Sequence, residues 1–303
     1  MEAPSSMFRR LLSRTLFPGV MCTLMGSAAW LLERGASPEG VVVVGSLSVG
    51  LCILVLERLH PHHASWNVSR GDVGTDVLHL LVSNVSVPKV CEWVFYPTLF
   101  LGTAWLAART GEQVWPTHWP LLLQGGLALL LAEFLQYAWH RACHEWDLLW
   151  RFHAIHHSAG RLYWLNAARF HPVDNFVGYL VGVGPLILLG CGPDVLAWHA
   201  LFTAAHGLFQ HANIRLKLGP LNWVFSMAEL HRWHHSTLAK EGNTNYGSNL
   251  IVWDVVFGTR FLPRDREPPE AIGIGGMPAF PQGYLAQIVA PFRWKRTQED
   301  SRG

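Results

Sequence analysis

The chain has 303 residues, of which 50% are hydrophobic and 15% are charged, and its mean hydropathy is +0.20. Soluble domains carry about 25% charged residues, so this composition argues against an ordinary soluble protein. The formal net charge of +2 comes with no basic stripe for nucleic acid, and the 5 scattered cysteines show neither disulfide nor CxxC metal spacing.

Two apolar blocks near the N-terminus predict a helical hairpin in the membrane. Residues 16–32 and 41–56 approach the ~20 residues that cross a bilayer as a helix. The first block follows basic residues, as in a signal peptide, but no small-residue cleavage site closes it, so we expect it to be retained. Arg9, Arg10 and Arg14 favour a cytoplasmic N-terminus, although a solubilised tail explains them equally well.

Two further spans are expected before the first histidine cluster. Residues 73–87 are mildly apolar and suit the membrane interface, whereas residues 90–108 form a spanning candidate that Pro97 interrupts. Residues 121–139 form the next candidate and lead directly into His140. Four crossings from a cytoplasmic N-terminus would return the chain to the cytoplasm at His140.

The apolar stretch after this point predicts a short hairpin. Residues 176–209 are apolar but are broken by Gly190, Gly192, Pro193 and Asp194. Two short helices joined there would enter the membrane and return, which keeps all the histidine clusters on one side. One straight crossing would separate the clusters.

The sequence therefore divides into three parts. Residues 1–139 are expected to form transmembrane helices, and residues 140–260 a histidine-rich catalytic region. Residues 261–303 are rich in Pro and Gly, which predicts a cytoplasmic tail of mostly irregular structure.

Three histidine clusters dominate the central region. Residues 140–144 read HRACH, residues 153–157 read HAIHH and residues 231–235 read HRWHH. On a helix, residues three and four apart share a face, so each cluster can direct two or three imidazoles to one point. Imidazole is the commonest neutral metal ligand and suits iron, zinc and copper. The clusters hold more histidines than one metal can use, which predicts two metals.

Other histidines are expected to have ordinary roles. A single histidine is more often a surface or satisfied buried residue than a ligand, and we expect this of His60, His62 and His63 in a polar loop. His206 could join His211 at a metal only if the helix ended between them, because five residues turn an ideal helix by about 140° beyond one full turn.

Motifs around the clusters extend the pattern beyond histidine. The central box reads LWRFHAIHHS at residues 149–158. It is flanked by RFHP at 169–172, QHAN at 210–213, NYG at 245–247 and WDVVFGT at 253–259. With these elements, the chain resembles the fatty acid hydroxylase/sterol desaturase superfamily over residues 133–259. The motifs are specific to the superfamily and do not specify a substrate.

The resemblance implies an all-α, integral-membrane bundle of about four spanning helices plus the short apolar hairpin, under a cytoplasmic helical cap that carries a dinuclear metal site. It implies an oxidoreductase that uses two Fe ions, O2 and external electrons to hydroxylate or desaturate a C–H position of a fatty acyl, sterol or ether lipid. The metal ligands expected from the clusters and the resemblance are His140, His144, His153, His156, His157, His171, His211, His231, His234 and His235.

Three residues have alternative interpretations. His171, in RFHP, is expected either to bind metal or to support a ligand. The pair His144 and Glu145 is similar to the alkylglycerol monooxygenase branch, where a carboxylate follows this histidine. Glu145 is therefore a candidate catalytic residue, as an extra ligand or a hydrogen-bond acceptor, although an ordinary helix-surface glutamate explains it equally well. Asp254 is expected either to hold the cap together, with Asn245, or to accept a hydrogen bond from a ligand histidine.

The same chemistry implies partners. The lipid would enter sideways from the bilayer, and electrons would come from a separate cytochrome b5- or ferredoxin-type donor, since no flavin, haem or Fe–S motif is visible. We expect a multi-pass protein of the endoplasmic reticulum or bacterial inner membrane, with its active site on the cytoplasmic face. A zinc-dependent membrane hydrolase would use similar ligands but lacks HExxH, and a metal transporter would need ionisable groups along the spans.

Overall fold

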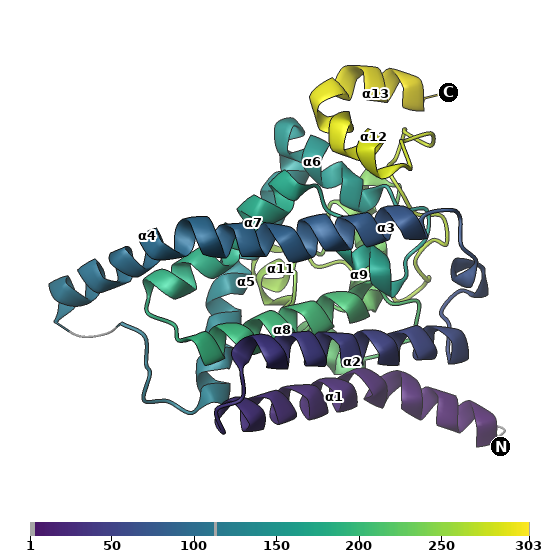
Figure 1. Cartoon of the computed structure of the whole chain (residues 1–303). Helices are drawn as coiled ribbons and strands as arrows, with labels where there is room; N and C mark the ends of the chain where they lie inside the picture. The colour runs from purple at the N-terminus through teal and green to yellow at the C-terminus, as the bar shows by residue number, and fades with distance from the viewer. Residues whose placement is uncertain (1–3, 112–113, 303) are drawn as a thin grey trace.

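In a computed structural model that describes residues 4–111 and 114–302, the chain is helical, as predicted, and the described residues form no β-strand (Figure 1). The α-helices are α1 Pro4–Leu32, α2 Pro38–Leu59, α3 Val73–His79, α4 Val87–Thr110, α5 Leu121–Glu145, α6 Asp147–His157, α7 Pro172–Leu188, α8 Pro193–His211, α9 Ala228–His234, α10 Ala239–Gly242, α11 Val252–Phe257, α12 Tyr284–Val289 and α13 Trp294–Ser301. The remaining elements are the 3-10 helices η1 Ala64–Asn67, η3 Trp164–Ala168, η4 Gly219–Trp223 and η5 Ala290–Arg293, and the π-helix η2 Leu80–Ser86.

Three helices in the described part of the chain are long and apolar enough to cross a membrane: α1 from Met7 onward, α2 and α5. On α2, Val44, Leu47 and Leu51 are exposed while Val49 and Ile53 are buried, so apolar side chains cover both its inner and its outer face. Such a helix suits contact with lipid on its outer side. The predicted crossing at residues 90–108 lies within α4, which is not one of the three helices.

The long helices pack around α8. Helices α1 and α2 lie side by side and both contact α8, while α5 contacts α7 and α8 and α4 contacts α7 (Figure 1). The core between them is apolar and includes Phe17, Ile53, Leu201, Ala205 and Phe209. Burial of these side chains holds the C-terminal end of α8 against the two N-terminal helices.

The predicted break in the second apolar stretch is present. Helix α7 ends at Leu188, and Gly190 takes a φ of +92°, which glycine adopts without a steric penalty. Pro193 then starts α8, because its fixed φ suits the first helical turn. The reversal brings His211, at the end of α8, close to the histidines of α6 and α9.

Two buried carboxylates hold the backbone of residues 246–249 in place. Glu133 of α5 accepts hydrogen bonds from the backbone N–H groups of Ser248 and Asn249. Asp254 accepts from the N–H groups of Tyr246 and Gly247 at 2.8 and 2.7 Å. Of its two expected roles, Asp254 therefore has the structural one, since it holds a turn and contacts no histidine in these bonds.

The C-terminal tail departs from the prediction. Residues 264–283 contain no helix, as expected, but residues 284–301 form α12, η5 and α13 without a break. The expectation of a mostly irregular tail is therefore wrong for residues 284–301. These helices are too short to be stable alone. They are stabilised because Trp294 and Phe280 are buried against Ile155 of α6.

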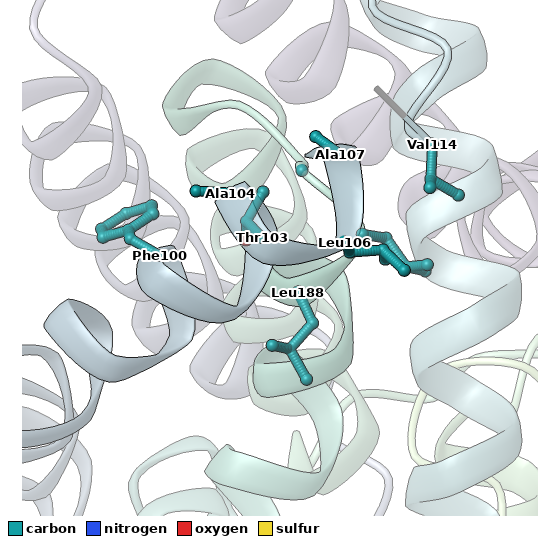
Figure 2. A pocket seen from close by; sticks show the side chains of 9 residues that line it. Phe100, Thr103, Ala104, Leu106, Ala107, Val114 and Leu188 are labelled. Carbon is teal, nitrogen blue, oxygen red and sulfur yellow. The ribbon is translucent and has the colours of Figure 1, made fainter. Parts of the chain in front are cut away.

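An apolar pocket of about 250 Å3 lies between the C-terminal halves of α4 and α7 (Figure 2). It is lined by residues such as Phe100, Thr103 and Leu188. Leu188 ends the helix whose first turn lies beside the histidines, roughly 25 Å away at 1.5 Å per residue. This pocket is therefore remote from the histidine clusters.

Candidate metal centre

The histidine clusters meet in two adjacent groups. Group one contains five histidines: His140, His144, His153, His157 and His234. Group two contains four histidines: His156, His211, His231 and His235. Within each group, one nitrogen of every ring lies within 4.8 Å of the corresponding nitrogens of the other rings.

The HxxHH spacing explains how two helices serve both groups. On α6, His153 and His157 are four residues apart and face group one, while His156 faces group two. In the box on α9, the first and third histidines, His231 and His235, belong to group two, and the second, His234, belongs to group one. The rings of His157 and His235 are 4.5 Å apart, so the two groups share a boundary.

Hydrogen-bond acceptors around group one orient three of its imidazole rings. His140 Nδ1 lies 2.7 Å from the carbonyl oxygen of Tyr246, and His234 Nδ1 lies 2.8 Å from that of Thr244. His153 Nδ1 lies 2.9 Å from the carboxylate of Asp174, where both side chains are buried. Because a carbonyl or carboxylate oxygen accepts, Nδ1 carries the proton in these rings, and Nε2 presents a lone pair to the group.

Group two has fewer such contacts. His211 Nδ1 lies 2.9 Å from Asn166 Oδ1. The Nδ1 atoms of His156, His231 and His235 are buried without a hydrogen-bond partner among the described residues. No carboxylate contacts a ring of this group in the hydrogen bonds of the described chain, in contrast to Asp174 in group one.

The arrangement of nitrogens suits metal cations. His140 Nε2 and His153 Nε2 are 3.0 Å apart although both present lone pairs, which repel each other unless a positive charge lies between them. The Nε2 atoms of His144, His157 and His234 are buried without a hydrogen-bond partner. Buried polar atoms are normally satisfied, and these inward-facing nitrogens are free to bind a metal ion.

The surroundings keep the imidazoles neutral. Burial lowers the pKa values of His157, His234 and His235 well below their ordinary value, and the neighbouring histidines lower them further. Neutral imidazole is the form that binds a metal. Phe170 stacks on His156 with ring centroids 4.3 Å apart, and Trp150 lies 5.3 Å from His157, so aromatic side chains cover parts of both groups.

Two of the expected site residues lie outside both groups. The carboxylate of Glu145 pairs with Arg141 at 2.7 Å, and its side chain is 49% exposed. Glu145 is one residue beyond His144, which rotates it by about 100° around the helix to the outer surface. His171 caps α7 by accepting from the N–H of Val173. Neither residue is among those that the structure brings together to hold a metal.

The remaining histidines also lie outside the groups. His60 Nε2 is 2.9 Å from Ser13 Oγ, which joins α1 to the end of α2. His206 stays on the continuous helix α8 and packs against Phe17 and Phe202. The sequence did not identify Asp174 or Asn166, the outward partners of His153 and His211. The only signal for Asp174 is an acidic residue in the first turn of an otherwise apolar helix.

Comparison with known proteins agrees with this geometry. Residues 126–259 match the family model described as fatty acid hydroxylase. The chain is 38% identical to the ornithine lipid hydroxylase OlsE of Rhizobium tropici, over 97% of this chain and 88% of that protein. This chain belongs to the fatty acid hydroxylase family. Because its relatives are lipid hydroxylases and monooxygenases, this family member is an oxidoreductase.

Other relatives of this fatty acid hydroxylase family member match a smaller part of it. An alkylglycerol monooxygenase of Xenopus tropicalis is 30% identical over 52% of the chain and 34% of that protein. A very-long-chain aldehyde decarbonylase, GL1-8, of Oryza sativa subsp. indica is 29% identical over 47% of the chain and 54% of that protein. No solved structure matches the chain significantly.

Proposed function

We propose that this protein is a membrane-bound di-iron hydroxylase that uses O2 and electrons from a separate donor to oxidise a C–H position of a lipid. The observation that carries the proposal is the pair of adjacent imidazole groups, with five and four members, of which His140 and His144 lie at the C-terminal end of the membrane-length helix α5. Such an all-nitrogen donor set suits two redox-active metal ions held side by side.

In this proposal, the imidazole nitrogens of each group would hold one iron. The two irons would supply the oxidising power that attack on an unactivated C–H bond requires and that no side chain has. Asp174 and the carbonyl of Tyr246 keep His153 and His140 in one tautomer and orientation. Phe170 limits the access of water to His156, which protects the reaction from side reactions.

The substrate class follows from the full-length relative. Because the similarity to an ornithine lipid hydroxylase extends over 97% of the chain, we take ornithine lipid as the first substrate to test and hydroxylation as the outcome. Hydroxylation converts R–H, O2, two electrons and two protons into R–OH and water. The two electrons must come from a donor, for which we propose a cytochrome b5- or ferredoxin-type protein.

We also propose that the metal centre faces the cytoplasm. The N–H of Lys217 donates to the carbonyl of Ser13, which places the start of α1 beside the cap. Arg9 and Arg14 are exposed at that end of the helix. Basic residues beside a span favour the cytoplasmic side, so the cap and the N-terminus are assigned to it together.

Lipid analysis of cells that express the wild type or His156→Ala, at matched protein levels and under 18O2, tests the proposed function. The wild type should add one labelled oxygen atom to an ornithine lipid, and His156→Ala should not. His118→Ala, which removes an exposed histidine from a loop, is the matched control and should behave as the wild type.

The metal content of the purified protein completes the test. Two iron ions per chain are expected, with a redox-active spectrum. Redox-silent zinc that supports turnover in the absence of O2 would overturn the proposal in favour of a zinc hydrolase. Unchanged lipids in cells with iron-loaded protein and a competent donor would overturn the assignment of a lipid substrate.

A further inference from the structure

Hydrogen bonds hold one side of the C-terminal segment, residues 284–302, against α3 and against the ends of α6 and α7. His79 Nε2 lies 2.8 Å from Gln287 Oε1, and His171 Nε2 lies 3.2 Å from the carbonyl oxygen of Ile288. Gln287 Nε2 also donates to Ser158 Oγ at 3.2 Å, directly after the central histidine box. These buried contacts fix the inner side of the segment relative to α3, α6 and α7.

The outer side of the same segment is apolar. Leu285, Val289 and Phe292 are exposed to 76, 40 and 69% of their surface. Large apolar side chains are exposed in groups on proteins mainly where a partner or a membrane covers them. The ring of Phe292 is 6.0 Å from His171, which caps the N-terminus of the apolar helix α7. The exposed apolar side chains of the segment therefore lie beside the N-terminus of α7.

Basic residues follow the apolar side chains at once. Arg293, Lys295 and Arg296 are all exposed, and Arg296 makes an ion pair with Asp300 at 3.6 Å. A short amphipathic segment with exposed Phe and Leu next to Lys and Arg is typical of elements that lie in a membrane interface. Each basic side chain near an anionic bilayer strengthens its attachment by about fivefold.

Exposed apolar side chains are also present on the helices next to the segment. Helix α12 packs against α3, where Val77 and Leu78 are exposed, and α3 continues through η2 into α4, where Val90 and Trp93 are exposed (Figure 1). A soluble partner on the segment would leave the apolar side chains of α3 and α4 in water, whereas a bilayer beside these helices would cover them as well. The occupant that the surface favours is therefore a lipid surface.

We propose that residues 284–296 form an interfacial anchor that inserts Leu285, Val289 and Phe292 into the bilayer surface and binds anionic headgroups through Arg293, Lys295 and Arg296. The anchor would fix the distance between the histidine groups and the membrane surface, because its inner side is hydrogen-bonded to the ends of α6 and α7. This inference does not depend on the proposed enzymatic function.

Site-directed fluorescence on the full chain in nanodiscs tests the anchor. Cysteines introduced one at a time, as Leu285→Cys or Phe292→Cys, carry the label in a Cys22→Ser/Cys52→Ser background that keeps only the three buried cysteines. Asp265→Cys in an exposed loop is the reference. Lipids with a nitroxide near the headgroup should quench the labels at 285 and 292 several-fold more than at 265. Aqueous iodide should show the opposite order.

Charge reversal tests the headgroup part separately. The variant R293E/K295E/R296E should lose most of the additional quenching that anionic lipid gives over zwitterionic lipid, and the milder K295Q/R296Q should lose part of it. Equal iodide quenching at 285, 292 and 265 in anionic nanodiscs would overturn the anchor and leave a protein-binding surface as the explanation. Quenching that is independent of lipid charge would overturn the role of the basic residues.

Discussion

The two histidine groups differ in the number of surrounding hydrogen-bond acceptors that orient their imidazole rings. In group one, Asp174 and backbone carbonyls fix His153, His140 and His234. In group two, the only such acceptor in the described chain is Asn166, on His211. Group one also has one imidazole more. If each group holds one metal ion, as we propose, group one should retain its ion more firmly and group two should leave more coordination positions open to reactants.

The largest effect should come from removing one imidazole from the smaller group. Loss of an outer partner costs about 10–100-fold, so His235→Ala should lower activity by more than about 100-fold and release one metal ion. His144→Ala leaves group one with as many imidazoles as group two has, and should retain both ions with a loss of about tenfold. Metal analysis and turnover of both variants measure the difference. Equal metal loss would contradict the asymmetry.

Asp174→Asn removes the negative charge behind group one. The affinity of that group for metal should fall by about 10–100-fold, because His153 loses its anionic partner. Competition with a chelator measures this affinity without relying on activity. Asp147→Asn, on the exposed first turn of α6, is the matched control and should leave it unchanged. An unchanged affinity in Asp174→Asn would show that the carboxylate is only structural.

Asn166→Ala removes the acceptor behind group two and should have a smaller effect, roughly tenfold or less, because the amide is uncharged. The same chelator titration applies. Asn166 also accepts from the N–H of Tyr163, so thermal unfolding must be measured with it. A loss in Asn166→Ala larger than that in Asp174→Asn would reverse the ranking of the two groups.

Acid pH should destabilise both groups, because burial lowers the pKa values of His157 in group one and His231 in group two. Unfolded histidine titrates near 6.5, so below this pH the unfolded chain binds more protons than the folded chain. The stability of metal-free protein should be constant above about pH 7 and fall below pH 6.5, by a few degrees in Tm. A Tm that rises toward acid pH would contradict this.

The spacing of the three histidine boxes predicted eight of the nine histidines in the two groups, and the family resemblance supplied the ninth, His211, but also His171, which lies in neither group. The i, i+3, i+4 spacing within each HxxHH box brings three rings to one side of a short helix, and that geometry is local. Which ring enters which group depends on how α6 and α9 face each other, which is not local. The contact between Asp174 and His153 spans 21 residues and leaves no periodic signal.

Two other expectations failed or stayed open for physical reasons. Glu145 follows a ligand-type histidine, but the next position on a helix points in another direction, and Arg141, one turn earlier, forms an ion pair with Glu145.

The helices of the C-terminal segment are too short to be stable alone, so their formation depends on burial of Trp294 against α6. Composition alone therefore predicted an irregular tail. The apolar blocks correctly predicted three membrane-length helices, although the expected fourth is not among them.

The interleaving of the two boxes has a consequence for assembly. Helix α6 supplies rings to both groups, and so does α9, so neither group can form correctly unless the two helices have already met in their final register. The first ion to bind therefore prepares the site of the second. In the proposed di-iron protein, occupation of one group should therefore raise the metal affinity of the other.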